Sequence, residues 1–274
     1  MYLENITRLP LIARLLLFIL LLLCFWIPFA LPISLLFAKD SNLVSILTMS
    51  LLGLEYLLLL KLWSKFVEKI PNGFQYYGWE WTYFNLSNLL KGISIGFSFC
   101  LCLFFVESLF GWLEIKPGSG NLILVVAQGL LSALAVAFFE ELFFRGWLLK
   151  ELEHNYSKLT SLVTSSLIFA LLHFLKPIAA AIRTFPQFPA LFLLGLILVW
   201  AKRSCRDKLG LSIGIHAGLI WGYYILNVGQ LLSYKSDVPD WLTGINHNPL
   251  SGVMGLLFLT LLAQIMQRRN KIIS

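Results

Sequence analysis

Long apolar runs constrain this chain more than any other feature of its sequence. Residues 11–37 carry a single charged side chain, Arg14, and a helix needs about 20 mostly apolar residues to cross a bilayer. The residues AVILMFWYC make up 58% of the 274 positions and DEKR only 13%, whereas soluble domains contain about 25% charged residues. A water-soluble globule of this length has too little interior for so much apolar surface. The sequence therefore predicts an all-α, polytopic helical bundle in a membrane.

Eight segments are expected as transmembrane helices. They cover residues 11–37, 43–63, 89–110, 121–144, 160–181, 187–201, 209–230 and 250–267. This division predicts an N-terminal part, residues 1–88, with two helices and a linker at the membrane interface. The second part, residues 89–274, holds the other six helices. The linker contains Tyr77, Trp79, Trp81 and Tyr83, and such amphipathic rings favour the headgroup region.

The basic residues predict the orientation of these helices. Eight spans would place both chain ends and every second loop on the same side of the membrane. These segments hold 16 of the 21 Lys and Arg residues. The positive-inside rule then predicts that both termini are cytoplasmic. The net charge of +7 is accounted for by this bias, so we expect no nucleic-acid partner. The four cysteines have no metal-ligand spacing and are expected to be reduced thiols.

A group of ionisable residues lies at the end of the fourth expected helix. Such groups inside a membrane are costly and mark function by default. Glu141 and Arg145 are four residues apart, so they share a helix face and are expected to form an ion pair. The neighbouring Glu140 points about 100° away from Glu141. It therefore needs a proton or a partner from another helix.

Two histidines are expected to supply that partner. Residues 154–158 form a polar turn, and positions 140 and 173 are equally far from its centre. In two antiparallel helices such positions lie at one depth, so Glu140 should face His173. His216 lies in the seventh expected helix, whose glycines recur at every fourth position from Gly210 to Gly222. This stripe predicts close helix packing, and His216 points away from it toward the predicted cavity.

These segments resemble the CPBP family, the CAAX-protease and bacteriocin-processing group of intramembrane endopeptidases, which includes bacterial abortive-infection proteins. The matching residues are Glu140, Glu141 and Arg145 of the pattern EExxxR, Phe169 and His173 of FxxxH, and His216 with Ala217. The resemblance covers a core of about residues 120–230. The family pattern has a polar residue at the position of Ile220.

The resemblance implies a glutamate-type intramembrane endopeptidase that needs no cofactor. Glu140 would be the general base on a water molecule, His173 would orient the water, and His216 would donate to the carbonyl oxygen. Glu141, Arg145 and Phe169 would support them. The implied partners are the lipid bilayer and membrane-associated peptide or protein substrates. The expected location is a bacterial inner membrane.

Two alternatives use the same residues differently. In the first, Glu140, His173 and His216 are zinc ligands of a metal-dependent intramembrane protease, with water in the fourth position. In the second, the chain keeps the family fold as a non-catalytic membrane immunity or scaffold protein. Ile220, in place of the polar residue, favours this second alternative.

Overall fold

The computed structural model of the protein describes residues 6–118, 120–235 and 237–273. Its regular structure is almost entirely helical, as the composition predicts. The chain divides into two compact units, Met1–Tyr77 and Gly78–Ser274. The domain boundary that we expect after residue 88 stays a prediction.

The first unit is a pair of long helices followed by one short helical turn. It contains α1 (Leu11–Leu36), α2 (Ser41–Phe66) and α3 (Gly73–Tyr76). Helix α2 begins after Asp40, whose side chain accepts a hydrogen bond from the Leu43 N–H at 2.9 Å, a typical N-terminal cap. Phe18 of α1 packs edge-on against Trp63 of α2, with ring centroids 5.2 Å apart. Aromatic packing along one face thus holds the two helices together.

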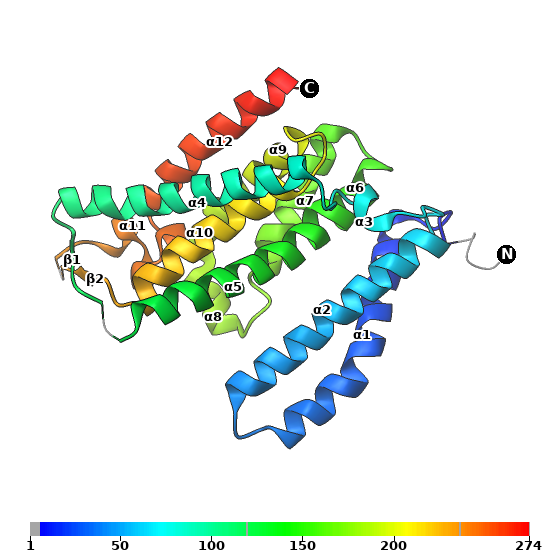
Figure 1. The fold of residues 1–274 in the computed structure, drawn as a ribbon, viewed down its shortest axis with the longest axis horizontal. Coiled ribbons are helices and arrows are strands. Elements are labelled where there is room, and N and C mark those ends of the chain that lie inside the picture. Colours follow the sequence, from blue (N-terminus) through cyan, green and yellow to red (C-terminus); the bar gives the residue numbers. More distant parts are fainter. Residues whose placement is uncertain (1–5, 119, 236, 274) are drawn as a thin grey trace. The chain divides into compact units, whose positions relative to one another are not determined.

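The second unit holds the remaining elements (Figure 1). Its long helices are α4 (Tyr83–Leu109), α5 (Leu122–Glu141), α7 (Lys158–Leu172), α9 (Phe188–Arg203), α10 (Gly210–Val228) and α12 (Val253–Ile273). The short elements are β1 (Leu113–Ile115), η2 (Leu142–Leu148), α6 (Leu149–Glu153), α8 (Ile178–Thr184), η3 (Phe185–Gln187), β2 (Leu232–Tyr234), α11 (Asp240–Thr243), η4 (Ile245–His247) and η5 (Pro249–Ser251). Helix α10 is central, because it packs against α4, α5 and α9.

The glycine stripe lets α10 lie almost backbone to backbone with α4. A Cβ atom on Gly214 would clash with the Leu89 carbonyl oxygen, and one on Gly92 would lie 2.8 Å from the Gly214 Cα. The expected close packing is therefore confirmed. At the start of both helices, Asn85 accepts a hydrogen bond from the Gly210 N–H at 2.8 Å, which fixes the register of α10 against α4.

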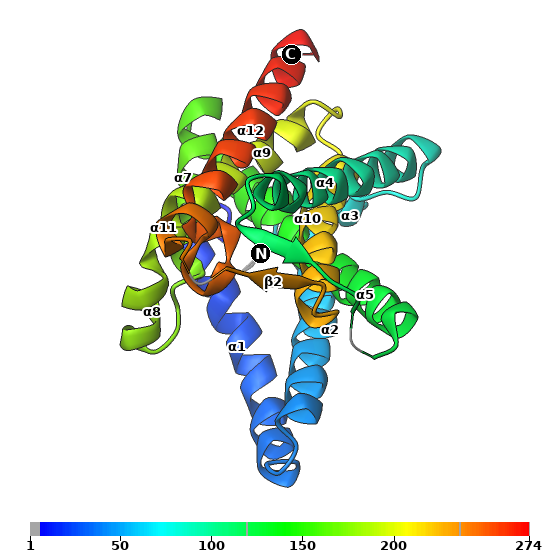
Figure 2. The same cartoon turned by 90° about the vertical axis from the view of Figure 1, so that its left-hand side faces the viewer.

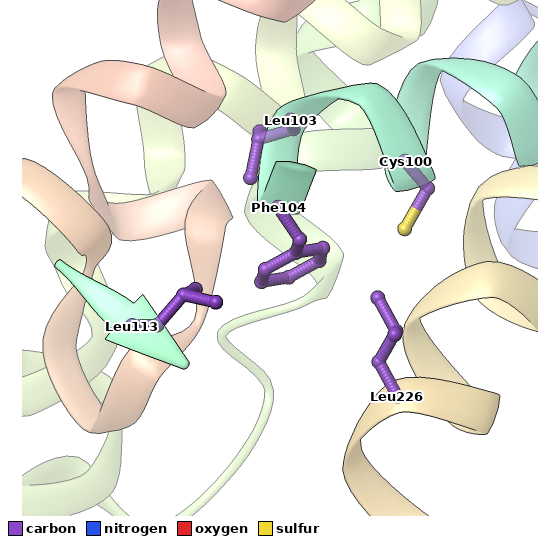
Figure 3. Close-up of a cluster of buried hydrophobic side chains, with 5 residues drawn as sticks. All are labelled: Cys100, Leu103, Phe104, Leu113 and Leu226. Atoms are coloured by element: carbon purple, nitrogen blue, oxygen red, sulfur yellow. The ribbon is translucent and has the colours of Figure 1, made fainter. Parts of the chain in front are cut away.

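A small two-stranded sheet closes the opposite end of this helix pair. Strands β1 and β2 pair antiparallel, with Leu113 opposite Tyr234, and Figure 2 looks onto this end. Behind the strands, Cys100 and Phe104 of α4 meet Leu113 and Leu226, and the Phe104 ring lies between the two leucines (Figure 3). The apolar cluster joins both helices and the two-stranded sheet into one core.

The prediction of one helix over residues 160–181 is wrong. Helix α7 ends at Leu172, and α8 begins at Ile178. Pro177 lies between them and serves as the N-terminal flanking residue of α8. Proline lacks an N–H and disfavours helical conformation in the residue before it, so the apolar run is split. His173 consequently lies directly after the end of α7 instead of inside a helix.

Six helical segments of the described chain are long and apolar enough to cross a membrane. They are Leu11–Leu36, Ser41–Phe66, Tyr83–Leu109, Leu122–Glu153, Ile178–Arg203 and Gly210–Val228. The class of an all-α polytopic membrane protein is thereby confirmed. The count of eight spans and the cytoplasmic termini stay predictions, because α7 is shorter than these segments and α12 is not among them.

Candidate active site

The two glutamates end α5 where the helix changes type. Glu140 and Glu141 are its last residues, and the following seven residues, Leu142–Leu148, form the π-helical segment η2. In a π-helix the backbone hydrogen bonds join residues five positions apart instead of four, and such segments occur frequently at functional sites. Sequence reasoning did not find this segment, because its residues have the ordinary apolar pattern of a helix.

The ion pair predicted from spacing is present. Arg145 Nη1 lies 2.9 Å from Glu141 Oε1, and both side chains are fully buried. Arg145 Nη2 also donates to the Gly195 carbonyl of α9 at 3.3 Å. Its guanidinium lies 4.2 Å from the centroid of the Phe169 ring, close enough for a cation–π contact. Contacts from three helices therefore fix the Arg145 side chain.

A buried lysine completes this group. Lys202 of α9 is fully buried, and its Nζ donates to the Arg145 carbonyl at 2.7 Å. That carbonyl lies inside the π-helical segment, where the regular helical ladder is altered. The sequence places Lys202 in a basic stretch that signals topology, so nothing in its pattern distinguishes it. Only the fold shows that it holds the segment after the two glutamates.

His216 lies between the two glutamates. Its Nδ1 is 3.0 Å from Glu141 Oε1, and its Nε2 is 3.9 Å from Glu140 Oε2. Because the carboxylate of Glu141 accepts, Nδ1 carries the proton of this bond and Nε2 faces the other carboxylate. Glu141 thus binds Arg145 and orients the His216 ring at the same time. Glu140 Oε2 itself has no hydrogen-bond partner among the described residues.

His173 is oriented by its own helix. Its Nδ1 lies 2.7 Å from the Phe169 carbonyl, so Nδ1 donates this hydrogen bond. In the neutral ring, Nε2 is then the hydrogen-bond acceptor. The Phe169 ring packs edge-on against both histidines, with centroids 4.6 Å from His173 and 6.1 Å from His216. Phe169 therefore positions both imidazoles.

The structure brings Glu140, His173 and His216 to one cavity of about 330 Å³. Its walls are mainly apolar side chains of α4, α9, α10 and α12. Ile220 lies on this wall, one turn after His216. The Glu140 side chain is 32% exposed, against 0% for Glu141. Of the two carboxylates, Glu140 is therefore the one that a substrate or water molecule can reach.

The three cavity residues do not form a compact metal cluster. Within the described ranges, the ligand atoms of Glu140, His173 and His216 do not all lie within 4.8 Å of one another. His216 Nδ1 is already bonded to Glu141. A zinc ion binds N and O ligands at about 2.0–2.2 Å, so these side chains would have to move closer together to share one.

Comparison with known proteins agrees with this geometry. Residues 121–222 match the sequence model of a family described as type II CAAX prenyl endopeptidase Rce1-like. This part of the chain is therefore similar to the Rce1-like family. The matched segment runs from the start of α5 into α10, so it contains Glu140, Glu141, Arg145, His173 and His216.

The match confirms the resemblance to the CAAX-protease group. The six apolar helical segments support an integral, multi-pass membrane protein, and its residues 121–222 are similar to the CAAX-type intramembrane proteases. No curated protein and no solved structure matches the chain significantly. The roles of the individual site residues therefore depend on geometry and chemistry.

Proposed function

We propose that this Rce1-like protein is a glutamate-type intramembrane endopeptidase that cleaves membrane-associated peptides or proteins in a bacterial inner membrane. One observation carries the proposal: a solvent-reachable carboxylate and two oriented imidazoles face one apolar cavity, with a buried ion pair behind them. Peptide hydrolysis needs a base, an oriented water and a donor to the developing oxyanion. The cavity offers a candidate for each.

Glu140 is the proposed general base. A water molecule in the cavity would donate one hydrogen bond to the Glu140 carboxylate and a second to His173 Nε2, whose lone pair is available because Nδ1 donates to Phe169. The water oxygen then attacks the carbonyl carbon while its proton passes to Glu140. When the C–N bond breaks, Glu140 returns this proton to the leaving nitrogen.

His216 is the proposed donor to the carbonyl oxygen. In its doubly protonated form, Nδ1–H donates to Glu141 and Nε2–H is directed to the cavity. A preorganised donor of this kind stabilises the charge that develops on the oxygen. Ile220 offers no hydrogen bond one turn further along α10, so this side of the cavity relies on His216.

Glu141, Arg145 and Phe169 are proposed as positioning residues. Glu141 holds His216, Arg145 neutralises Glu141, and Phe169 contacts both imidazoles and the guanidinium. The proposed mechanism does not require a metal ion, because Glu140 transfers the proton and His216 stabilises the charge on the carbonyl oxygen. A zinc-dependent reaction would instead make activity sensitive to chelators and restorable by added metal.

The experiment compares cells that produce the wild-type protein with cells that produce Glu140→Gln. New peptide termini in the membrane fraction are identified by mass spectrometry. We expect a set of cleaved peptides that is present with the wild type and absent with the variant. Glu114→Gln is the matched control, since Glu114 is an exposed carboxylate on β1. Identical termini in wild-type and Glu140→Gln cells would favour a non-catalytic scaffold.

A further inference from the structure

A groove outside the candidate active site lies between α4 and α12. Its volume is about 630 Å³, and it is lined by the first turns of α4 and by Arg269 near the end of α12. The two helices contact each other only sparsely, and Figure 1 shows them diverging toward the C-terminus. The groove is therefore open to the surroundings between two helices, and no residue of the proposed mechanism lines it.

Two cationic side chains face this groove without a counter-charge. Lys91 and Arg269 both line it, and no carboxylate of the described residues lies within ion-pair distance of either. Among the described residues, Arg269 Nε is buried without a hydrogen-bond partner, and Arg269 Nη2 has a long contact of 3.7 Å with the Cys205 sulfur. Glu80, near the same end of α4, is bound to Lys208 at 2.7 Å.

Two aromatic residues near the groove indicate its position across the bilayer. Trp81 and Tyr83 are 79% and 89% exposed, and such rings settle at the headgroup level of a bilayer. Lys91 lies eight residues after Tyr83, about 12 Å further along the helix. A lysine at that position extends its ammonium back toward the interface along its aliphatic stem. Its charge would then lie beside lipid phosphates.

The rest of the groove is lined mainly by apolar side chains, which can contact lipid. Leu86, Leu90 and Ile95 form its apolar side, and Leu90 is 64% exposed. Ser87 and Ser94 add hydroxyl groups. Two cations beside an apolar strip are complementary to one phosphate with its acyl chains, since basic pockets between membrane helices bind anionic headgroups.

We propose that this groove binds one anionic phospholipid, with its phosphate between Lys91 and Arg269 and an acyl chain along Leu90 and Ile95. The site is separate from the catalytic proposal and does not depend on it. The chemistry recognised is a phosphate monoanion. The apolar strip makes a lipid, not a free phosphate ion, the expected source.

The test uses the full-length protein purified in a mild non-ionic detergent. Its thermal midpoint is measured during titration with dioleoylphosphatidylglycerol, with dioleoylphosphatidylcholine and with inorganic phosphate. A ligand that binds only the folded state raises the midpoint in a saturable way. We expect saturable stabilisation by phosphatidylglycerol alone.

The variant pair isolates the charges of the groove. Lys91→Gln/Arg269→Gln should melt like the wild type without lipid, because Lys91 is exposed and neither side chain forms an ion pair with a described residue. It should need at least tenfold more phosphatidylglycerol for half of the stabilisation. Lys65→Gln/Lys158→Gln removes the same charge elsewhere and should respond as the wild type does. An unchanged titration in the first variant, or an equal effect of phosphatidylcholine, would overturn the proposal. An equal effect of inorganic phosphate would show a free-anion site and overturn the lipid assignment.

Discussion

Replacing Glu141 by glutamine removes the negative charge on which the buried centre of the site depends. Glu141 Oε1 accepts hydrogen bonds from Arg145 at 2.9 Å and from His216 at 3.0 Å, and its side chain has no exposed surface. In Glu141→Gln, the guanidinium keeps its bond to the Gly195 carbonyl at 3.3 Å and its contact with the Phe169 ring, but the side chain at position 141 becomes neutral. A fully buried cation thereby loses the carboxylate with which it forms its ion pair.

The expected loss of stability is large. Breaking one partner of a buried ion pair typically costs about 3–5 kcal/mol, because the other charge is stranded. For a unit of about 200 residues, each kcal/mol lowers the thermal midpoint by roughly 2–4 °C. The midpoint of Glu141→Gln should therefore fall by roughly 6–20 °C. It can be measured on detergent-purified protein by intrinsic fluorescence.

A second substitution tests the cause of this loss. Arg145→Met in the Glu141→Gln background removes the stranded charge and keeps an apolar stem, so part of the lost stability should return. The wild type, Glu141→Gln, Arg145→Met and the double variant form a double-mutant cycle. Their stabilities give the coupling energy between the two side chains. Glu114→Gln, on exposed β1, should change nothing. A Glu141→Gln midpoint equal to that of Glu114→Gln, or a double variant less stable than both single variants, would refute this reasoning.

Three further outcomes are expected. Gly214→Ala should reduce the yield of folded protein, because its methyl group would clash with the Leu89 carbonyl and overpacking costs about 1–3 kcal/mol; an unchanged midpoint would contradict it. Lys202→Met should lower the midpoint and the activity together, since it removes a buried hydrogen bond from a charged group to the Arg145 carbonyl, which contributes about 1.5–3 kcal/mol. In a chain whose native cysteines are replaced by alanine, single cysteines at positions 5 and 272 should both resist an impermeant thiol reagent applied from outside. Labelling at one end alone would mean an odd number of spans.

The sequence predicts the parts of the site that depend on local spacing. The interval of four residues is sufficient to pair Glu141 with Arg145, and the polar turn at residues 154–158 is sufficient to bring the helices of Glu140 and His173 together. Both arguments need only helix geometry and chain connectivity. The fold class follows as directly from the length of the apolar runs.

The sequence does not predict the features that arise from tertiary packing. The π-helical segment after Glu141 and the buried contact of Lys202 depend on how α9 packs against it. The bond between His216 and Glu141 joins residues 75 positions apart, so no local pattern reveals it. The break at Pro177 is different, because the proline is visible in the sequence, but a prediction based on hydrophobicity alone continues the helix through it.

The central claim is that the Glu140 carboxylate activates water for peptide hydrolysis. The most direct measurement uses purified protein in proteoliposomes, with a peptide that wild-type cells cleave, in water labelled with heavy oxygen. The wild type should place the label in the new carboxyl terminus. Glu140→Gln should keep the wild-type melting profile and slow the incorporation by roughly 100- to 10,000-fold, the usual contribution of a general base. Incorporation by Glu140→Gln at the wild-type rate would contradict the account.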